Sequence, residues 1–453
     1  MTSPDVNTLH AHVWPTATTR TPEGALQVAG ADVRALVAEH GTPVYLLDEA
    51  DVRRRAVAFR DAFATAFERI GTRADVYYAG KAFLSTALAR WITQEGLRLD
   101  VCTGGELAIA RRAGVPGANI GLHGNNKSMT EIAEAVEYGV GRIVVDSFEE
   151  VDRVASVARA HGVVVPVMLR VKAGVEAHTH EFIATAHEDQ KFGFSLAGGQ
   201  VADAVAAVLK HPDALTLLGF HSHIGSQIFE AEGFRVAATR LIALQLEVAR
   251  GHGITLPELD LGGGFGIAYL PDDRPMAPQE LADQLAEIVA TACHEQGAPV
   301  PHISVEPGRA IVGPGGVTVY EVGTVKPVQA TDDLVRTYVS VDGGMSDNAR
   351  PALYDARYTC VLANRTSDTA PVQSRVVGKH CESGDIVVRD VLLPGDVQAG
   401  DLIAVPATGA YCRSLASQYN HTPRPPVVAV RDGASQVVVR RETVADLLAL
   451  EGQ

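Results

Sequence analysis

A lysine and a glutamate each follow a short apolar segment, a position from which either could reach a bound molecule. Lys81 comes after residues 75–78, and Glu306 comes after residues 303–305. A desolvated lysine amine loses its proton and can form a Schiff base with an aldehyde. A carboxylate beside a pyridine nitrogen keeps that nitrogen protonated and makes the ring an electron sink. The alternatives are a surface lysine that closes a turn and a buried Glu306–Arg309 ion pair.

A run of glycines in residues 261–266 (LGGGFG) is the second chemical signal. Gly262, Gly263 and Gly264 have no Cβ atoms, so their backbone N–H groups can approach an anion closely. A tight turn would explain one of these glycines but not several. Because no Gly-Lys-Ser/Thr follows, the run is not a P-loop, and a single phosphate monoester fits it better than a nucleotide.

His221 and His223 form an HxH pair, and Ser226 follows it. Side chains at i and i+2 share a face in extended chain, so the pair could bind a metal, as in barrel hydrolases of the amidohydrolase type. In those hydrolases the pair closes the first strand, whereas here it follows about the sixth. The other interpretation is an imidazole stacked on a cofactor ring, with Ser226 donating to the cofactor's phosphate.

The elements that must position these residues alternate between short β-branched and longer amphipathic segments, which predicts β-α units and a parallel sheet. The expected strands are residues 75–78, 99–101, 120–122, 142–145, 165–171, 217–221, 258–261 and 303–305. This number favours a closed (β/α)8 TIM-type barrel over residues 44–312, although a doubly wound open sheet is an alternative. In a barrel the turns after the strands meet at one mouth, where active sites form.

The second half of the chain has a different pattern. Its expected strands are residues 317–325, 337–341, 374–377, 386–391 and 427–430, and the breaker residues 313–316 (GPGG) precede them. We therefore expect a mostly-β domain, a barrel or sandwich, over residues 313–453. Residues 1–43 contain no β-α unit and are expected to pack on it.

Composition narrows the class of partners. The 453 residues are 46% hydrophobic and 21% charged, with a net charge of −15. This balance predicts a folded soluble protein that binds neither nucleic acid nor membrane, since a negative surface repels phosphates. No apolar run is long enough to span a bilayer. Five cysteines without CxxC spacing, and no signal-peptide pattern, predict free thiols in a reducing cytoplasm.

Together these segments resemble the fold-type III pyridoxal-phosphate decarboxylases, most closely the diaminopimelate decarboxylases. The similar segments are residues 78–83, 100–107, 123–127, 175–180, 191–195, 221–227, 261–266, 306–309, 342–354, 381–385, 409–412 and 419–420. Two departures are mild, namely Thr103 where serine is commoner and Ala173 where proline is commoner. Neither position carries an expected chemical role.

The resemblance implies pyridoxal 5'-phosphate as cofactor and a role for each site residue. By similarity Lys81 holds the cofactor, His223 stacks on its ring, and Glu306 pairs with the ring nitrogen. Ser226, Gly262, Gly263, Gly264 and Tyr411 would take the phosphate. Cys381, presented from the partner subunit of a homodimer with composite active sites, is the expected proton donor.

Substrate choice follows from the expected distal contacts. Arg309, Arg350, Tyr354 and Tyr411 would hold a distal carboxylate, and Glu382 would pair with a distal ammonium. This set favours decarboxylation of meso-2,6-diaminopimelate to L-lysine and CO2. The alternatives are an ornithine, arginine or lysine decarboxylase of the same fold, a metal-dependent TIM-barrel hydrolase, and a non-catalytic cofactor-binding homologue. Glu306 disfavours an alanine-racemase-like activity, because alanine racemases have an arginine, not a glutamate, at the cofactor's ring nitrogen.

Overall fold

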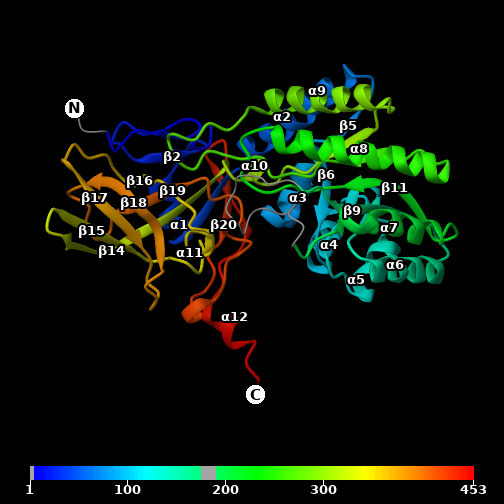
Figure 1. Ribbon diagram of the computed structural model, residues 1–453. Helices are drawn as coiled ribbons and strands as arrows, with labels where there is room; N and C mark the ends of the chain where they lie inside the picture. Colours follow the sequence, from blue (N-terminus) through cyan, green and yellow to red (C-terminus); the bar gives the residue numbers. More distant parts are fainter. Residues whose placement is uncertain (1–4, 175–189, 453) are drawn as a thin grey trace. The chain divides into compact units, whose positions relative to one another are not determined.

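The computed structural model describes residues 5–174 and 190–452, and the chain forms two compact units. The first unit consists of Arg55–Gly266 and Pro275–Gly308. The second consists of Met1–Arg54, Ile267–Arg274 and Arg309–Gln453. Strands ringed by helices make up the first unit and extended sheets dominate the second (Figure 1).

The first unit is a closed barrel of parallel strands. Its eight strands are β5 (Ala74–Ala79), β6 (Arg98–Val101), β7 (Ile120–Leu122), β8 (Arg142–Val145), β9 (Val165–Lys172), β11 (Leu215–His221), β12 (Glu258–Asp260) and β13 (His302–Val305). Neighbours pair in parallel, and β13 pairs with β5 to close the ring. The short β10 (Phe194–Ser195) extends β9. The predicted (β/α)8 barrel and all eight of its strands are confirmed, and the open doubly wound sheet is wrong.

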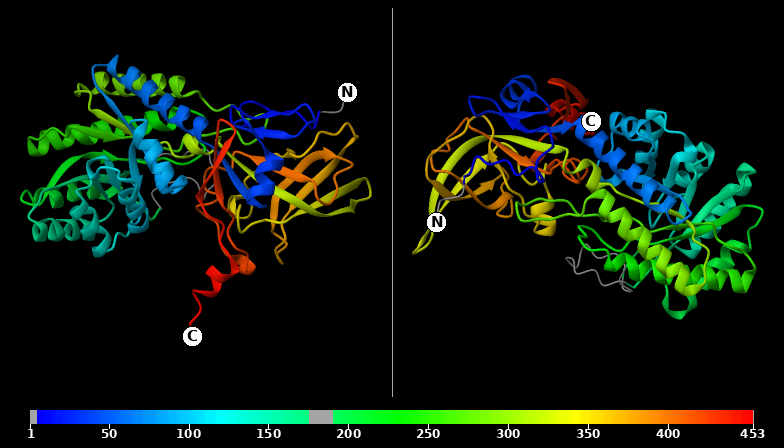
Figure 2. Two further views of the ribbon diagram at one scale, coloured as in Figure 1. Left: turned by 180° about the vertical axis from the view of Figure 1, so that it is seen from behind. Right: turned by 90° about the horizontal axis from the view of Figure 1, so that it is seen from above.

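Helices alternate with the barrel strands and cover them (Figures 1 and 2). They are α2 (Glu49–Glu68), α3 (Thr86–Gln94), α4 (Gly104–Ala113), α5 (Met129–Tyr138), α6 (Phe148–His161), α7 (Gln200–Leu209), α8 (Glu232–His252) and α9 (Pro278–Gln296). The short 3-10 turns are η1 (Gly80–Ala82), η2 (Gly117–Asn119) and η3 (Ala197–Gly199). Because helices cover the barrel, most residues of its strands are buried, although β6, β8, β12 and β13 also carry polar or charged residues.

The sequence fixes where these helices begin and end. The hydroxyls of Ser85, Thr103 and Ser147 each accept a hydrogen bond from the backbone N–H three residues further on. Gly114 and Gly162 end α4 and α6 in the left-handed conformation, where a residue with a Cβ is disfavoured. The strands β5, β6 and β8 therefore lead into short turns of defined length at the mouth of the barrel.

Mostly antiparallel sheets form the second unit, with two parallel strand pairs. Its strands are β1 (Thr19–Arg20), β2 (Leu26–Val28), β3 (Ala31–Asp32), β4 (Val44–Asp48), β14 (Gly316–Thr331), β15 (Leu334–Val341), β16 (Val361–Leu362), β17 (Pro371–Val377), β18 (Ile386–Pro394), β19 (Leu402–Pro406), β20 (Val427–Arg431) and β21 (Ala434–Val439). Its helices are α1 (Val33–His40), α10 (Arg309–Val312), α11 (Arg350–Tyr354), α12 (Val444–Leu448) and the turn η4 (Tyr419–His421). The strand order of the main sheet is β18-β17-β15-β14-β4-β20-β21, in which β15 is parallel to β17 and β20 is parallel to β4. In addition, β19 pairs with β14, and β16 pairs with β19. The long hairpin of β14 and β15 is drawn in yellow tones in Figure 2.

The N-terminal segment packs on this second unit, as expected. Val13, Trp14 and Leu26 are buried in one apolar cluster with Val317 and Val428. Fully burying such side chains contributes about 1.5–3 kcal/mol each. The expected strands of this unit are confirmed, whereas β1, β2, β3, β16, β19 and β21 were not anticipated.

The two units divide the chain differently from the expected bounds of 44–312. The strand β4 pairs with β14 and β20, so residues 44–48 lie in the second unit rather than in the barrel. Ile267–Arg274 also joins the second unit, and the barrel unit ends at Gly308. A buried apolar strand has the same sequence pattern in the barrel and in the second unit, because only the strand it pairs with differs. Among the described residues, no helix is long and apolar enough to cross a membrane.

Candidate active site

Lys81 lies in η1, the turn that directly follows β5. Gly80 and Ala82 on either side of it are buried, whereas Lys81 itself is exposed. A Cβ on Gly80 would lie 2.8 Å from the carbonyl oxygen of Asp100 at the end of β6, so the turn sits tightly against its neighbour. The position at the carboxyl end of a barrel strand is the one expected for a reactive amine.

Glu306 follows β13, which is the strand that pairs with β5. Barrel closure therefore places Glu306 and Lys81 after two adjacent strands, although they are far apart in the sequence. A Cβ on Gly308 would lie 2.9 Å from the carbonyl oxygen of Ala79, so the Glu306 turn packs directly on the end of β5. The Glu306 side chain is buried. Burial raises the pKa of its carboxyl group, while the nearby His123, Arg142 and Lys81 oppose that rise.

The glycine run holds three loop backbones together. A Cβ on Gly262 would lie 2.5 Å from the Ser222 carbonyl oxygen, one on Gly263 would lie 2.1 Å from that of Glu306, and one on Gly264 would lie 2.2 Å from that of Gly225. Positive φ angles at Gly262 and Gly264 add a second reason for glycine. The run is thus explained by close packing of the loops after β11, β12 and β13, which the sequence argument did not consider. Whether it also cradles an anion stays a prediction.

His223 and Ser226 lie beside this glycine run. The backbone N–H of Gly263 donates to Nδ1 of His223 at 3.2 Å, so the His223 ring has a fixed orientation and keeps its proton on Nε2. Ser226 lies in the same loop. On one side of it, Gly225 packs against Gly264, and on the other side the N–H of Ile228 donates to the Gly264 carbonyl at 2.9 Å. The structure therefore brings His223, Ser226 and the glycines together.

The two histidines of the HxH pair face different partners and do not converge on one point. His221 Nε2 lies 3.1 Å from Glu306 Oε1, whereas His223 faces Gly263. His123, at the end of β7, lies 3.4 Å from the same Glu306 oxygen. The group whose spacing would suit a metal ion is therefore His123, His221 and Glu306. His123 lies in the segment 123–127 that resembles the decarboxylases, but no role was predicted for it.

Lys127 is a structural lysine of the same end of the barrel. Its ammonium donates to the carbonyl oxygens of Gly124 and Val144, each at 2.6 Å, and to Glu150 Oε2 at 3.0 Å. All three of its donors are therefore used, and its side chain is buried. Such a lysine is held too firmly to serve as a mobile reactive amine.

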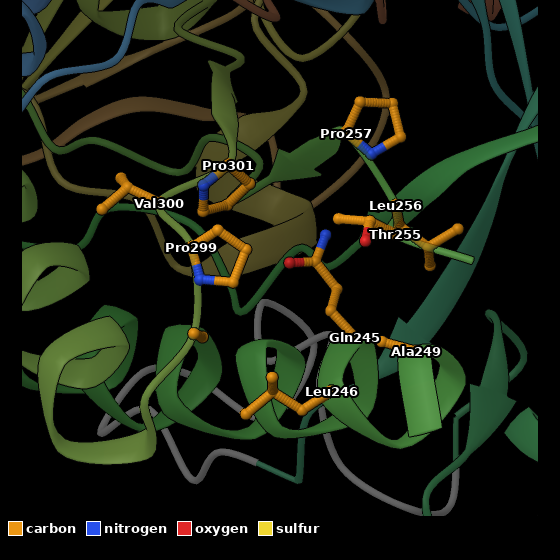
Figure 3. A pocket seen from close by; sticks show the side chains of 10 residues that line it. Gln245, Leu246, Ala249, Thr255, Leu256, Pro257, Pro299, Val300 and Pro301 are labelled. Atoms are coloured by element: carbon orange, nitrogen blue, oxygen red, sulfur yellow. The ribbon is translucent and has the colours of Figure 1, made fainter. Parts of the chain in front are cut away.

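A small cavity at the opposite end of the barrel lacks reactive groups (Figure 3). Its volume is about 130 Å³, and Pro257 and Pro301, which precede β12 and β13, line it. None of its lining residues has a titratable side chain, and the Gln245 amide that reaches it already donates to the Glu258 carbonyl at 2.7 Å. The chemistry is therefore expected at the mouth and not here.

In the second unit, two buried arginines share one tyrosine. Arg309 donates to the Tyr269 hydroxyl and its guanidinium lies 4.7 Å from the centre of the Tyr411 ring. Arg350 lies 4.7 Å from the centre of the Tyr269 ring and donates to the Tyr358 hydroxyl. The predicted Arg309, Arg350 and Tyr411 are thus brought together. Tyr269 and Tyr358 were missed, since no motif marks them.

Tyr354 is the last residue of α11, which begins with Arg350, and it is partly exposed. Cys381 and Glu382 lie in the loop between β17 and β18, and both are exposed. Asn420 Oδ1 accepts from the Cys381 N–H at 3.2 Å. Neighbours on a regular strand point to opposite faces, so this loop conformation allows both side chains to face the same side. The similar segment at residues 175–180 falls outside the described residues.

The Cys381 loop is anchored from below by Asp385, which sequence reasoning also missed. Its carboxylate accepts from the N–H groups of Met345 at 2.6 Å and His380 at 2.7 Å. Cβ atoms on Gly344 and Gly378 would lie 2.4 and 2.2 Å from the two oxygens of this carboxylate. The loop is therefore built around one buried carboxylate.

Three comparisons with known proteins agree with this architecture. The profile of the family described as "Pyridoxal-dependent decarboxylase, pyridoxal binding domain" matches residues 49–313. The chain is 53% identical over 447 residues to the diaminopimelate decarboxylase of Mycobacterium tuberculosis (strain ATCC 25618 / H37Rv), covering 98% of both chains. It is 44% identical over 428 residues to that of Bacillus subtilis (strain 168), covering 94% of this chain and 95% of the relative.

Solved structures show the same relationship. The crystal structure of diaminopimelate decarboxylase from M. jannaschii in complex with L-lysine superposes with a TM-score of 0.88 at 29% identity, covering 96% of this chain and 97% of that one. The family match spans more than half of the chain, and the similarity to the relatives spans nearly all of it. The chain therefore belongs to the pyridoxal-dependent decarboxylases, and within them to the diaminopimelate decarboxylase family.

Proposed function

We propose that this enzyme decarboxylates meso-2,6-diaminopimelate to L-lysine and CO2 with pyridoxal 5'-phosphate as cofactor. The observation that carries the proposal is the pairing of β13 with β5, which sets Glu306 beside the turn of Lys81. An amine and a carboxylate on adjacent strand ends are the two groups that such a cofactor needs at its aldehyde and at its ring nitrogen. The free cysteines agree with a cytoplasmic enzyme.

The residues at the mouth fit the cofactor. Pyridoxal phosphate, when bound, supplies an aldehyde that links to an amine and a ring that accepts the electron pair left by a departing carboxylate. Lys81 would hold the aldehyde and release the product amine, and Glu306 would accept a hydrogen bond from the ring nitrogen. His223 would stack on the ring. The phosphate would be taken by Ser226, Gly262, Gly263, Gly264 and Tyr411.

The substrate's distal end would be recognised by residues of the second unit. Arg309 and Arg350 supply positive charge for the distal carboxylate, and the hydroxyls of Tyr354 and Tyr411 supply donors. Glu382 would pair with the distal ammonium. Cys381 Sγ would give a proton to the carbon atom that has lost its carboxylate. A plain diamine-forming substrate has no distal carboxylate for these two arginines to bind.

We further propose that the active enzyme is a homodimer in which Cys381 and Glu382 serve the partner's barrel. Both residues are exposed on a loop and contribute little to their own unit, as expected for groups that act on another subunit. The single-residue variants Lys81→Ala and Cys381→Ala are each expected to lose nearly all turnover, because one loses the reactive amine and the other the proton donor. Mixing the two inactive proteins tests the arrangement.

After subunit exchange the mixture should regain about one quarter of wild-type CO2 release, because about half of the dimers are hybrid and one of their two sites is intact. The control mixture is Lys81→Ala with Glu306→Gln, which should stay inactive because both residues belong to one barrel. Lys210→Ala, an exposed lysine after α7, should keep full activity. Hybrid dimers that stay inactive would argue for sites built within one chain. Restoration by the control mixture would argue against a common site for Lys81 and Glu306.

A further inference from the structure

The surroundings of Arg350 in the second unit are unusual for a buried arginine. Its side chain is buried, and no carboxylate of the described residues forms an ion pair with it. Arg365, in the same unit, shows the usual arrangement, because its guanidinium lies 2.7 Å from Asp401. A buried charge is costly unless a partner offsets it. The charge of Arg350 is therefore available to a ligand, and other groups must hold the side chain in place.

Neutral groups surround Arg350 where a carboxylate would be expected. Its guanidinium donates to the Tyr358 hydroxyl, and it lies 4.7 Å from the centre of the Tyr269 ring and 5.6 Å from that of Tyr358. The two rings meet edge to face at 80°, with their centres 5.2 Å apart. Aromatic faces attract a cation but carry no net charge. The guanidinium is thus held on two sides without being neutralised.

A thiol and an amide continue the contacts behind Tyr358. Cys412 Sγ lies 3.7 Å from the Tyr358 hydroxyl and donates to Asn348 Oδ1 at 3.5 Å. Arginine can only donate and an amide oxygen can only accept, so Tyr358 accepts from Arg350 and donates to Cys412. The backbone N–H of Asn348 donates in turn to the Gly344 carbonyl at 2.9 Å. A chain of three side chains therefore connects the guanidinium to the backbone of the 344–348 turn.

The members of this chain keep their ordinary protonation states at pH 7. Burial raises the pKa of Tyr358 well above its usual value, although Arg350 opposes that rise, and burial raises the pKa of Cys412 to about 11. Burial disfavours the charge of Arg350, but Tyr269, Tyr358 and Cys412 outweigh it and raise its pKa. The hydroxyl and the thiol are therefore neutral, and the guanidinium keeps its full charge.

We propose that Tyr358 and Cys412 are positioning residues for Arg350. They hold the guanidinium in one orientation without neutralising it, so that it binds the distal carboxylate of the substrate and selects against substrates that lack one. The inference rests on the proposed function, because it assigns a purpose to Arg350 that only a substrate with a second carboxylate requires. It adds two residues that act through Arg350 and not by contact with the substrate.

The first test compares two inhibitors that differ by one carboxylate. L-lysine keeps the distal carboxylate of diaminopimelate, and cadaverine is the same molecule without it. Their inhibition constants are measured on holoenzyme by competition with diaminopimelate. Tyr358→Phe keeps the ring but removes the acceptor, so the constant for L-lysine should rise about 10-fold, while that for cadaverine changes by less than about twofold. An unchanged constant for L-lysine, or an equal rise for both inhibitors, would overturn the proposal.

The kinetics of diaminopimelate decarboxylation provide an independent readout. Arg350 would bind the end of the substrate that does not react, so Tyr358→Phe should raise KM about 10-fold and leave kcat within about twofold. Tyr138→Phe is the matched control, because it removes a hydroxyl on α5 that donates to the Val115 carbonyl at 2.7 Å. It should leave KM and both inhibition constants unchanged. A fall in kcat alone in Tyr358→Phe, or an equal rise in KM in Tyr138→Phe, would contradict the positioning role.

Substitutions of Cys412 test the chain behind Tyr358. Cys412→Ser keeps a side chain that can accept from Tyr358 and donate to Asn348, so it should retain the preference for L-lysine over cadaverine. Cys412→Ala removes both contacts and lets the Tyr358 hydroxyl turn, so the preference should fall by about 3- to 10-fold. The same preference in the two variants would mean that the thiol only fills space, and would refute the role of Cys412.

The proposed function can fail separately from this inference. Wild-type protein that shows no cofactor absorption band, or releases no CO2 from diaminopimelate, would refute the function whatever the Tyr358 variant does. Active wild-type enzyme that prefers L-lysine to cadaverine, with the same preference in Tyr358→Phe, would refute only the positioning role. Active wild-type enzyme that binds the two inhibitors equally would show that Arg350 does not bind the distal carboxylate, and would overturn the inference as well.

Discussion

The candidate catalytic residues of the barrel mouth and those of the Cys381 loop have different surroundings. At the barrel mouth, Glu306 is surrounded by buried side chains that carry charge or can carry it, and glycines clear the space between the loops. In the second unit, Cys381 and Glu382 are exposed, and backbone N–H groups that donate to Asp385 and Asn420 shape their loop. Function and stability should therefore be coupled in the barrel and separable in the loop.

This difference follows from where each group must work. A carboxylate that serves a ring nitrogen acts in a low dielectric, so its surroundings must supply the balancing charges. A thiol and a carboxylate that meet a charged substrate can remain solvated until the substrate arrives. Buried charges are costly to disturb, whereas exposed side chains on a rigid loop can be replaced freely.

The largest effect on stability is expected from Arg142→Met. Arg142 is buried in an ion pair with Asp260, so its removal leaves an unpaired buried carboxylate and costs about 3–5 kcal/mol. Burial already raises the pKa of Asp260, and the variant should raise it further. A carboxyl whose folded pKa exceeds its unfolded value destabilises the fold as pH rises. The loss should therefore be larger at pH 8 than at pH 5.

Tryptophan fluorescence can follow each unit separately, since Trp91 lies in the barrel unit and Trp14 in the other, and the chain has only these two. In a Trp14→Phe background, urea unfolding of Arg142→Met reports on the barrel. Arg389→Met breaks an exposed pair with Asp355 in the second unit and is the control, followed by Trp14 in a Trp91→Phe background and expected to cost at most about 1 kcal/mol. Equal costs for the two substitutions would remove the contrast between the buried and the exposed regions.

A smaller effect is expected from Asp385→Asn, which changes the anchor of the Cys381 loop. The substitution replaces the charged carboxylate, to which two backbone N–H groups donate, by a neutral amide. This should lower the free energy of unfolding by about 1–3 kcal/mol and kcat/KM by about 10-fold. Cofactor affinity should not change, because Asp385 lies outside the barrel unit. Trp14 fluorescence in a Trp91→Phe background measures the stability. Asp390→Asn on β18 is the exposed control, and a similar loss there would show that Asp385 is no special anchor.

The sequence allowed the prediction of features that recur along the chain and concealed those that depend on pairing in space. The eight barrel strands were predictable because each is a short apolar segment ahead of a polar turn, and Lys81 and Glu306 followed from their places after such segments. Nothing local shows that His123 and His221 converge on Glu306, because β7 and β11 are not neighbours. The pairing of β4 with β14, the sharing of Tyr269 by two arginines and the anchoring role of Asp385 were hidden for the same reason.

The smallest effect on stability, with a large effect on selectivity, is expected from Glu382→Gln. The side chain is exposed, and its Oε1 accepts only weak contacts within its own loop, from Ser383 Oγ and the Gly384 N–H, each at 3.3 Å. The free energy of unfolding should therefore change by less than about 0.5 kcal/mol. If Glu382 pairs with the distal ammonium, loss of its charge costs about 2–4 kcal/mol of binding, or roughly 30- to 1000-fold in kcat/KM.

The decisive measurement compares diaminopimelate with 2-aminopimelate, which lacks the distal amine. Wild-type enzyme should prefer diaminopimelate strongly, and Glu382→Gln should lose most of that preference by losing activity on diaminopimelate alone. Ser383→Ala removes the loop contact but keeps the charge, so it should preserve the preference. If both variants lowered activity on the two substrates equally, Glu382 would be a loop-ordering residue. Its exposure argues against that role, because a solvated side chain with two 3.3 Å contacts has little hold on its backbone.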